Sequence, residues 1–246
     1  MERRVYREYS HCLNRDMEFI VYGTGGKPVL AVPSQDGRYF DFENFGMVEV
    51  CRDYIESGRI QLFSFDTIDK ETWSNEWGDP HWRMQMQEAW FHYVVDELYP
   101  RLMEINGSGQ KMMVTGCSMG AYHAANFFFR RPDLFDTVVS MSGIYNPQLL
   151  IPDYFDELTY YNSPVHSLRG MPDDHPYMEM FRHSKIIICV GQGAWEDLML
   201  VGTRELDTVL TQRGIPAWID YWGFDVNHDW PWWRKQWRYF LEKTLG

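Results

Sequence analysis

A serine flanked by two glycines is the first feature of the chain that could perform chemistry. Residues 116–120 read Gly-Cys-Ser-Met-Gly, which matches the pattern G-x-S-x-G with Ser118 at its centre. An apolar run precedes the pattern and an Ala-rich helical segment follows it, as expected for a nucleophile on a sharp strand-to-helix turn. Such a turn strains the serine backbone, and glycines two residues to either side avoid side-chain collisions. We therefore predict that Ser118 is a catalytic nucleophile.

The neighbouring Cys117 is a second candidate nucleophile. It occupies a variable position of the motif, whose side chain should turn into the structure. Most buried cysteines are inert, because a thiol loses its proton less readily away from water. We expect Cys117 to be a buried, inert thiol.

A serine hydroxyl needs a general base, and histidine is the usual one. In enzymes built around this kind of turn, the chain order is serine, then acid, then histidine. Of the eight histidines, His228 alone follows both the last predicted strands and the candidate acids. We predict that His228 is the general base.

Two adjacent carboxylates follow the apolar run of residues 185–190 and could orient the histidine. They are Glu196 and Asp197, in the segment Gly-Gln-Gly-Ala-Trp-Glu-Asp of residues 191–197. Either carboxylate could hold the imidazole and stabilise its cation. We prefer Glu196 and keep Asp197 as the alternative, while Asp225 and Asp229 are expected to shape the loop of the histidine or cap the helix after it.

Attack on a carbonyl produces an oxyanion, which needs two N–H donors. The backbone N–H of Met119 follows the nucleophile at the start of a helix, where the helix dipole also favours negative charge. The second donor should come from the loop after residues 29–32, which reads Pro-Ser-Gln-Asp-Gly. We expect the N–H of Gln35 or that of Asp36 to fill this role.

The elements that position these residues alternate between strand and helix. A hairpin is predicted over residues 5–10 and 17–22, closed by the turn-rich residues 23–28, and it is followed by strands at 29–32, 60–65, 111–115, 137–141, 185–190 and 217–222. Helices are predicted at 45–56, 82–105, 121–129, 198–212 and 231–243. The alternation predicts an α/β fold: a mostly parallel central sheet with an N-terminal antiparallel hairpin and helices on both faces. Functional loops then gather at the carboxyl ends of the strands.

The length and composition predict one domain. The chain has 246 residues, of which 45% are hydrophobic and 24% charged, as in ordinary globular proteins. The strand-helix alternation lapses at about residues 145–182, and we interpret this stretch as an insertion over the active-site end of a single domain spanning residues 1–246.

The charge argues against several classes of partner. A formal net charge of −12 disfavours nucleic acid, since phosphate binding needs clustered Lys and Arg. No apolar run approaches the length of a membrane span or follows the N-terminus as in a signal peptide, so we expect a cytoplasmic protein. No histidine or cysteine spacing suits a metal, and we predict no metal and no cofactor. The oligomeric state stays open, including a homo-oligomer.

Two segments of the chain resemble the esterase family of α/β-hydrolases that includes esterase D (S-formylglutathione hydrolase), bacterial feruloyl esterases and the mycolyltransferase antigens. They are GCSMGAYHAANFFFRRPDLFDTVVSMSGIYN at residues 116–146 and VNHDWPWWRKQWRYFL at residues 226–241. The resemblance implies the α/β-hydrolase fold and the chemistry of a serine esterase, and it places the acid best at Glu196. The chain departs from the family at the oxyanion loop, where P-S-Q-D-G replaces an H-G-x-G-G run.

These residues favour a serine carboxylic-ester hydrolase that works through an acyl-enzyme on a small-molecule ester. The same triad could pass the acyl group to an alcohol, as an acyltransferase does, and a non-catalytic binding protein that keeps the fold is the third hypothesis. Aromatic side chains near the site could stack on an aromatic or sugar-linked ester, or they could simply wedge loops together. They are Trp73, Trp77, Trp82, Trp195 and Trp230.

Overall fold

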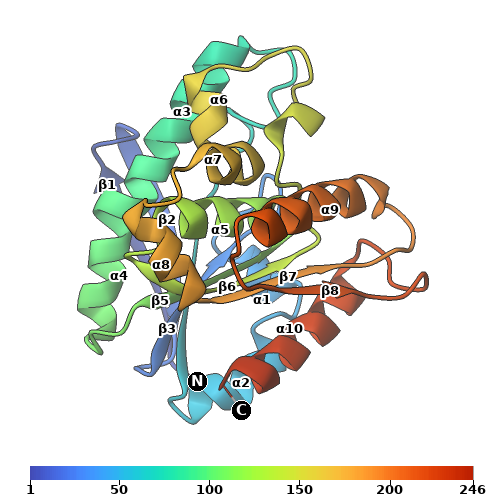
Figure 1. Ribbon diagram of the computed structural model, residues 1–246. Coiled ribbons are helices and arrows are strands. Elements are labelled where there is room, and N and C mark those ends of the chain that lie inside the picture. Colours follow the sequence, from blue (N-terminus) through green and yellow to red (C-terminus); the bar gives the residue numbers. More distant parts are fainter. Residues whose placement is uncertain (246) are drawn as a thin grey trace.

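The eight strands of the protein form one sheet in the order β1-β2-β4-β3-β5-β6-β7-β8 (Figure 1), in a computed structural model that describes residues 1–245. The strands are β1 (Arg3–Ser10), β2 (Arg15–Tyr22), β3 (Lys27–Val32), β4 (Ile60–Phe65), β5 (Met112–Cys117), β6 (Phe135–Met141), β7 (Lys185–Val190) and β8 (Trp218–Tyr221). β1 and β2 are antiparallel, β2 also runs antiparallel to β4, and every pair from β4 to β8 is parallel. The predicted mostly parallel sheet with an N-terminal hairpin is confirmed.

The turn that closes the hairpin was predicted at the wrong place. Residues 11–14 join β1 to β2, and Asn14 adopts a positive φ of 52° there. The glycine-rich residues 23–26 instead lead from β2 into β3, which does not pair with β2 because β4 lies between them. Asparagine tolerates this left-handed conformation better than most residues, so a short turn without glycine can reverse the chain.

Helices cover both faces of the sheet (Figure 1). α1 (Asp41–Asn44), η1 (Glu49–Cys51), α2 (Arg52–Glu56) and α10 (Trp230–Leu245) lie on one face. The other face carries α3 (Pro80–His92), η2 (Tyr93–Leu98), α4 (Tyr99–Asn106), α5 (Met119–Arg130) and α9 (Asp197–Gln212). Successive residues of a central strand enter opposite cores: Ile186 and Ile188 pack on the α5 side, whereas Ile187 and Cys189 pack on the α10 side. A strand that is buried on both faces therefore has a continuous apolar sequence.

Two predicted helices differ from the structure. The helix expected at 45–56 begins only at residue 49, as η1 followed by α2, because residues 45–48 form a turn in which Gly46 has a φ of 76°; the short helix α1 ends before this turn. The helix expected at 82–105 runs from α3 through η2, a π-helical turn, into α4. Pro100 cannot donate a hydrogen bond to the carbonyl of Asp96, and the helix widens in the turn that directly precedes this proline.

The chain between β6 and β7 consists of short helices: η3 (Pro147–Leu149), α6 (Glu157–Tyr161), α7 (Pro164–Gly170) and α8 (Pro176–Arg182). It lies on the α5 face of the sheet, with α6 beside α3 and α7 beside α5 and α9 (Figure 1). Ile151 shares an apolar cluster with Met119, the residue after the predicted nucleophile. The position of the segment as an insertion over the active-site end of a single domain stays a prediction.

No helix within residues 1–245 is both long enough and apolar enough to cross a membrane.

Candidate active site

Ser118 lies in the turn between β5 and α5, where the G-x-S-x-G motif predicts it. Its backbone is strained, with φ 57° and ψ −123°, and its side chain is partly exposed. A Cβ atom on Gly116 would lie 2.2 Å from the carbonyl oxygen of Gly120. A Cβ atom on Gly120 would lie 2.4 Å from the carbonyl oxygens of Val32 and Pro33, at the end of β3. Both glycines are therefore needed for the close packing that presents the serine.

His228 lies in the loop between β8 and α10 and reaches the serine. Its Nε2 is 2.8 Å from Oγ of Ser118. The backbone N–H of His228 donates to the carbonyl oxygen of Ala194 at 2.9 Å, and the imidazole packs edge-on against Trp233 with 4.8 Å between ring centroids. His228 is thus held in place by contacts of both its backbone and its ring.

Glu196, and not Asp197, reaches the histidine. Oε2 of Glu196 lies 3.3 Å from Nδ1 of His228, and the glutamate side chain is 1% exposed. Asp197 is exposed at the start of α9. Trp195, immediately before the acid, has a positive φ of 67°. The structure therefore brings together Ser118, His228 and Glu196 from three separate segments.

A second serine supports the acid, and the sequence analysis did not identify it. Oγ of Ser142 donates to Oε1 of Glu196 at 2.6 Å and accepts a hydrogen bond from Nε1 of Trp233 at 3.2 Å. Ser142 follows β6 directly, is fully buried and has a positive φ of 60°. In the sequence, Ser142 stands out only as part of the Ser-Met-Ser-Gly segment at residues 140–143. This segment does not by itself reveal the contact with Glu196.

The loops that carry the acid and the base are also joined to each other. Oδ1 of Asn227, beside the histidine, accepts a hydrogen bond from the backbone N–H of Ala194 at 2.9 Å. The N–H of Gly193 donates to the carbonyl oxygen of Val226 at 2.8 Å. These bonds link residues 193–194 to residues 226–227. They hold Glu196 and His228 in a fixed position relative to each other.

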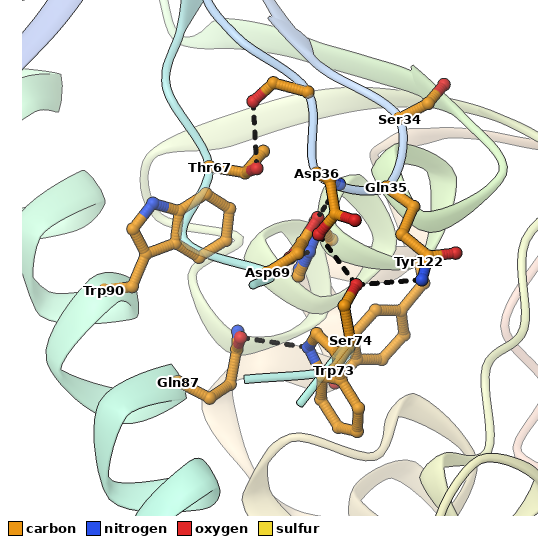
Figure 2. A network of polar contacts seen from close by, with 12 residues as sticks. Ser34, Gln35, Asp36, Thr67, Asp69, Trp73, Ser74, Gln87, Trp90 and Tyr122 are labelled. Carbon is orange, nitrogen blue, oxygen red and sulfur yellow. Dashed lines mark hydrogen bonds and ion pairs between the residues drawn. The ribbon is translucent and has the colours of Figure 1, made fainter. Parts of the chain in front are cut away.

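The loop after β3 forms a tight turn against the nucleophile. The N–H of Gly37 donates to the carbonyl oxygen of Ser34 at 2.9 Å, and Oγ of Ser34 donates to the carbonyl oxygen of Cys117 at 3.2 Å. Of the two predicted donors, Asp36 gives its N–H to Oδ2 of Asp69 at 3.1 Å (Figure 2). Within residues 1–245, the backbone N–H groups of Gln35 and Met119 have no hydrogen-bond partner. Gln35 is therefore the better candidate for the second donor.

Cys117 is buried, with a relative exposure of 2%, and its side chain packs in the core on the α10 side. Burial raises the pKa of the thiol well above its ordinary value. The thiol thus stays protonated at neutral pH and is a poor nucleophile.

The five tryptophans considered as site residues divide into two groups. Trp73 packs edge-on against Tyr122 of α5, and Trp230 of α10 stacks on Phe45, just after α1, at 4.1 Å between ring centroids, so both rings pack against other parts of the protein. Trp77 and Trp195 are 98% and 82% exposed, and Trp82 is 42% exposed. Of these exposed rings, that of Trp195 is next to a triad residue in the chain. In residues 1–245, no group of three or more His, Cys, Asp or Glu side chains is arranged to hold a metal ion.

Comparisons with known proteins identify the family. The family model described as "Putative esterase" matches residues 10–243 of the chain. No curated protein sequence matches the chain.

Several solved structures resemble the protein over nearly their whole length. One described as a ferulic acid esterase has a TM-score of 0.75 at 18% identity, with 100% of this chain and 98% of that chain covered. An S-formylglutathione hydrolase from Agrobacterium tumefaciens has a TM-score of 0.76 at 14% identity, with 99% and 95% covered. MPT51 from Mycobacterium tuberculosis has a TM-score of 0.70 at 14% identity, with 100% and 98% covered. The chain belongs to the "Putative esterase" family, and it is a serine esterase with the α/β-hydrolase fold.

Proposed function

We propose that the protein hydrolyses carboxylic esters through an acyl-enzyme on Ser118, with His228 as general base and Glu196 as the acid that orients it. The observation that carries the proposal is the continuous path of contacts from Oγ of Ser118 through the two imidazole nitrogens to the buried carboxylate of Glu196. Each group stands in the order and at the distance that nucleophilic catalysis by serine requires.

The first half of the reaction forms the acyl-enzyme. Oγ of Ser118 attacks the ester carbonyl carbon while its proton moves to Nε2 of His228. The carboxylate of Glu196 accepts a hydrogen bond from Nδ1–H and stabilises the imidazolium cation. When the tetrahedral intermediate collapses, the C–O bond to the alcohol breaks, and the proton passes from Nε2 to the leaving oxygen.

The second half releases the acid. Water occupies the place of the alcohol and gives a proton to Nε2 of His228 as its oxygen attacks the acyl carbon. The second tetrahedral intermediate then expels Oγ of Ser118, which takes the proton back. One water is consumed, and the enzyme returns to its starting state.

Both tetrahedral intermediates carry a negative oxygen that needs donors already in place. The N–H of Met119 begins α5, and the N–H of Gln35 lies in the turn that Ser34 ties to Cys117. Backbone donors of this kind do not reorganise during the reaction, and losing one costs about 2.7 to 4 kcal/mol of transition-state stabilisation.

The structural neighbours suggest which classes of ester to test first. The structural neighbours include proteins described as ferulic acid esterases and as S-formylglutathione hydrolases. Hydroxycinnamoyl esters and short-chain thioesters are therefore the first substrates to test. The exposed ring of Trp195 beside the acid offers an apolar surface that an aromatic acyl group could cover.

The experiment is a panel of p-nitrophenyl esters, hydroxycinnamoyl esters and short-chain thioesters, assayed with wild type and Ser118→Ala, with and without an added alcohol. We expect turnover by wild type that is lost in the variant, with the free acid as the main product. An acyl product on the alcohol that exceeds hydrolysis would instead indicate a transferase. No turnover of any ester by folded wild type would contradict the proposal.

A further inference from the structure

A buried hydrogen-bonded pair, Asp69 and His123, lies behind the oxyanion loop, outside the triad. Oδ1 of Asp69 is 2.9 Å from Nε2 of His123, and their side chains are 1% and 0% exposed. His123 belongs to α5, five residues after the nucleophile, and its ring packs against Trp90 with 4.6 Å between ring centroids. The other nitrogen, Nδ1, is buried and has no hydrogen-bond partner within residues 1–245.

This geometry indicates which nitrogen of His123 carries the proton. An imidazolium cation would bury an unpaired N–H at Nδ1 among aromatic rings, which is costly. A neutral ring protonated at Nε2 donates to Asp69 and leaves only an acceptor unpaired. The carboxylate of Asp69 is thus a fixed, water-free acceptor whose second oxygen is available for another donor.

That second oxygen holds the oxyanion loop. Oδ2 of Asp69 accepts the backbone N–H of Asp36 at 3.1 Å. Oδ1 of Asp36 accepts a hydrogen bond from Oγ of Ser74 at 2.7 Å, and Nε2 of Gln35 donates to the same hydroxyl at 2.8 Å. Figure 2 shows these bonds converging on the turn that carries Gln35 and Asp36.

The bond to Asp69 decides how the turn is oriented. Asp36 is the third residue of the turn from Ser34 to Gly37 and has a φ of 59°, which glycine adopts freely and which costs an aspartate some strain, although less than it costs most other residues. Rotating the peptide between Gln35 and Asp36 would relieve this strain and convert the turn to the commoner type with negative φ. The same rotation would swing the N–H of Asp36 away from Asp69. The buried carboxylate therefore opposes the relaxation.

We propose that Asp69, fixed by His123, is a positioning residue that anchors the turn from Ser34 to Gly37 at the N–H of Asp36, so that the N–H of Gln35, one peptide earlier, stays in place for the developing oxyanion. The anchor matters at this position because residue 36 is Asp, whereas a glycine would adopt the same conformation without strain. The inference rests on the proposed function, since the oxyanion arises only in acyl transfer.

The first test compares Asp69→Ala with Asp69→Asn. The asparagine keeps an oxygen for the N–H of Asp36, and its NH₂ can face Nε2 of His123 once the imidazole proton moves to Nδ1, whereas the alanine keeps neither group. We expect Asp69→Ala to lower kcat by on the order of 10 to 100-fold with KM close to wild type, because a misplaced donor affects mainly the transition state. Asp69→Asn should retain most of kcat. Equal kcat in wild type and a folded Asp69→Ala would overturn the proposal.

A second pair of variants avoids the buried core, in case Asp69→Ala does not fold. Asp36→Gly and Asp36→Val both remove the carboxylate of Asp36, but glycine accepts a positive φ and the β-branched valine resists it. We expect kcat of the valine variant to be at least about tenfold below that of the glycine variant. If the two variants have the same kcat, the conformation of this residue does not control the oxyanion site, and the proposal is wrong.

Hydrogen exchange at the backbone amide of Asp36 tests the positioning role of Asp69 independently of esterase activity. The amide of Asp36 should exchange slowly in wild type and in Asp69→Asn, and faster in Asp69→Ala and Asp36→Val, whatever the activity. A wild type without esterase activity but with a protected Asp36 amide would contradict the proposed function alone. Normal Ser118-dependent hydrolysis with an unprotected Asp36 amide would contradict the positioning role alone.

Discussion

Glu196, the proposed acid of the triad, differs from Asp197 mainly in burial and in the direction of its side chain. Glu196 is buried and has two partners, the imidazole of His228 and the hydroxyl of Ser142. Asp197 begins α9 and faces water. Two adjacent carboxylates at the start of a helix point in different directions, so only one of them can reach the base.

Glu196→Gln should lower kcat strongly. A glutamine can present its NH₂ to the imidazole and favour the wrong tautomer, as in other triads where the acid was neutralised with a loss of about 10⁴ in kcat. We expect a loss of at least about 10²-fold, measured with a p-nitrophenyl ester. Asp197→Asn is the matched control and should keep wild-type kcat. A strong loss in the control with little change in Glu196→Gln would assign the acid to Asp197.

Ser142→Ala should lower kcat more moderately. The substitution removes the hydroxyl between Glu196 and Trp233 and leaves a carboxylate oxygen without its protein donor. We expect a fall on the order of tenfold in kcat, smaller than that for Glu196→Gln. The control is Ser140→Ala, two residues earlier on β6, whose hydroxyl bonds Ala121 and Tyr145 and no member of the triad. A control that loses as much kcat as Ser142→Ala would show that the loss comes from general disturbance of the core.

Backbone strain at the level of the elements is concentrated around the triad. Within residues 1–245, five residues other than glycine have a positive φ, and four of them lie in the turns that build the site. These four are Asp36, Ser118, Ser142 and Trp195. Each follows the carboxyl end of a parallel strand, namely β3, β5, β6 or β7. The sheet supplies a rigid edge, and strained turns at this edge direct the functional groups toward one point.

Gly120→Ala tests the contact between two of these elements. Alanine normally favours a helix over glycine, but its Cβ atom would lie 2.4 Å from the carbonyl oxygens at the end of β3. We expect the free energy of unfolding to fall by about 1 to 3 kcal/mol, with a loss of activity, since β3 carries the oxyanion loop. Gly25→Ala is the control, because its Cβ atom would meet no other atom within 4 Å. Urea unfolding that shows no difference between the two variants would contradict this close contact.

Hydrogen bonds to the carboxylate of Asp156 make the stability of the segment between β6 and β7 depend on pH. Burial acts to raise the pKa of this carboxyl, but hydrogen bonds from Tyr154, Thr159 and His81 outweigh it and lower the pKa to about 2. The carboxylate caps the N-terminus of α6 by accepting from the N–H of Thr159 at 2.7 Å. Because the folded pKa lies below the unfolded value near 3.8, the stabilisation is present above that value and is lost as pH falls toward 2.

Asp156→Ala should therefore lower the free energy of unfolding by about 1 kcal/mol or more at pH 7, with a smaller difference from wild type at pH 3. Urea titrations at the two pH values measure both differences. Asp153→Ala, at an exposed position three residues earlier, serves as the control and should be close to wild type at both. A difference that grows as the pH falls would refute the assignment of the low pKa to Asp156.

For the molecule as a whole, the sequence predicts best what depends on continuous apolar runs and chain order. The strands at residues 60–65 and 185–190 agree to the residue with β4 and β7, because strands buried on both faces are largely apolar, although β4 also buries Gln61 and Ser64. Ser118 and His228, which the structure places 2.8 Å apart between Oγ and Nε2, could be named as candidates because the glycines and the chain order are local or sequential features.

Other parts of the structure depend on contacts between distant segments and were beyond prediction. Ser142 meets Glu196 across 54 residues, and Asp69 meets His123 across the same sequence separation. Neither pair has a motif of its own. The turn around Gly46 and the turn at Asn14 depend on single backbone conformations that hydrophobic periodicity does not register.

The most direct test of the account is the site of the covalent intermediate. Wild type is mixed with a p-nitrophenyl ester, quenched in acid within the first turnovers and digested, and the mass of each peptide is measured. We predict a single acyl group, on Ser118, together with no adduct and no turnover in Ser118→Ala. An acyl group on another residue, or hydrolysis at the wild-type rate by Ser118→Ala, would contradict the mechanism.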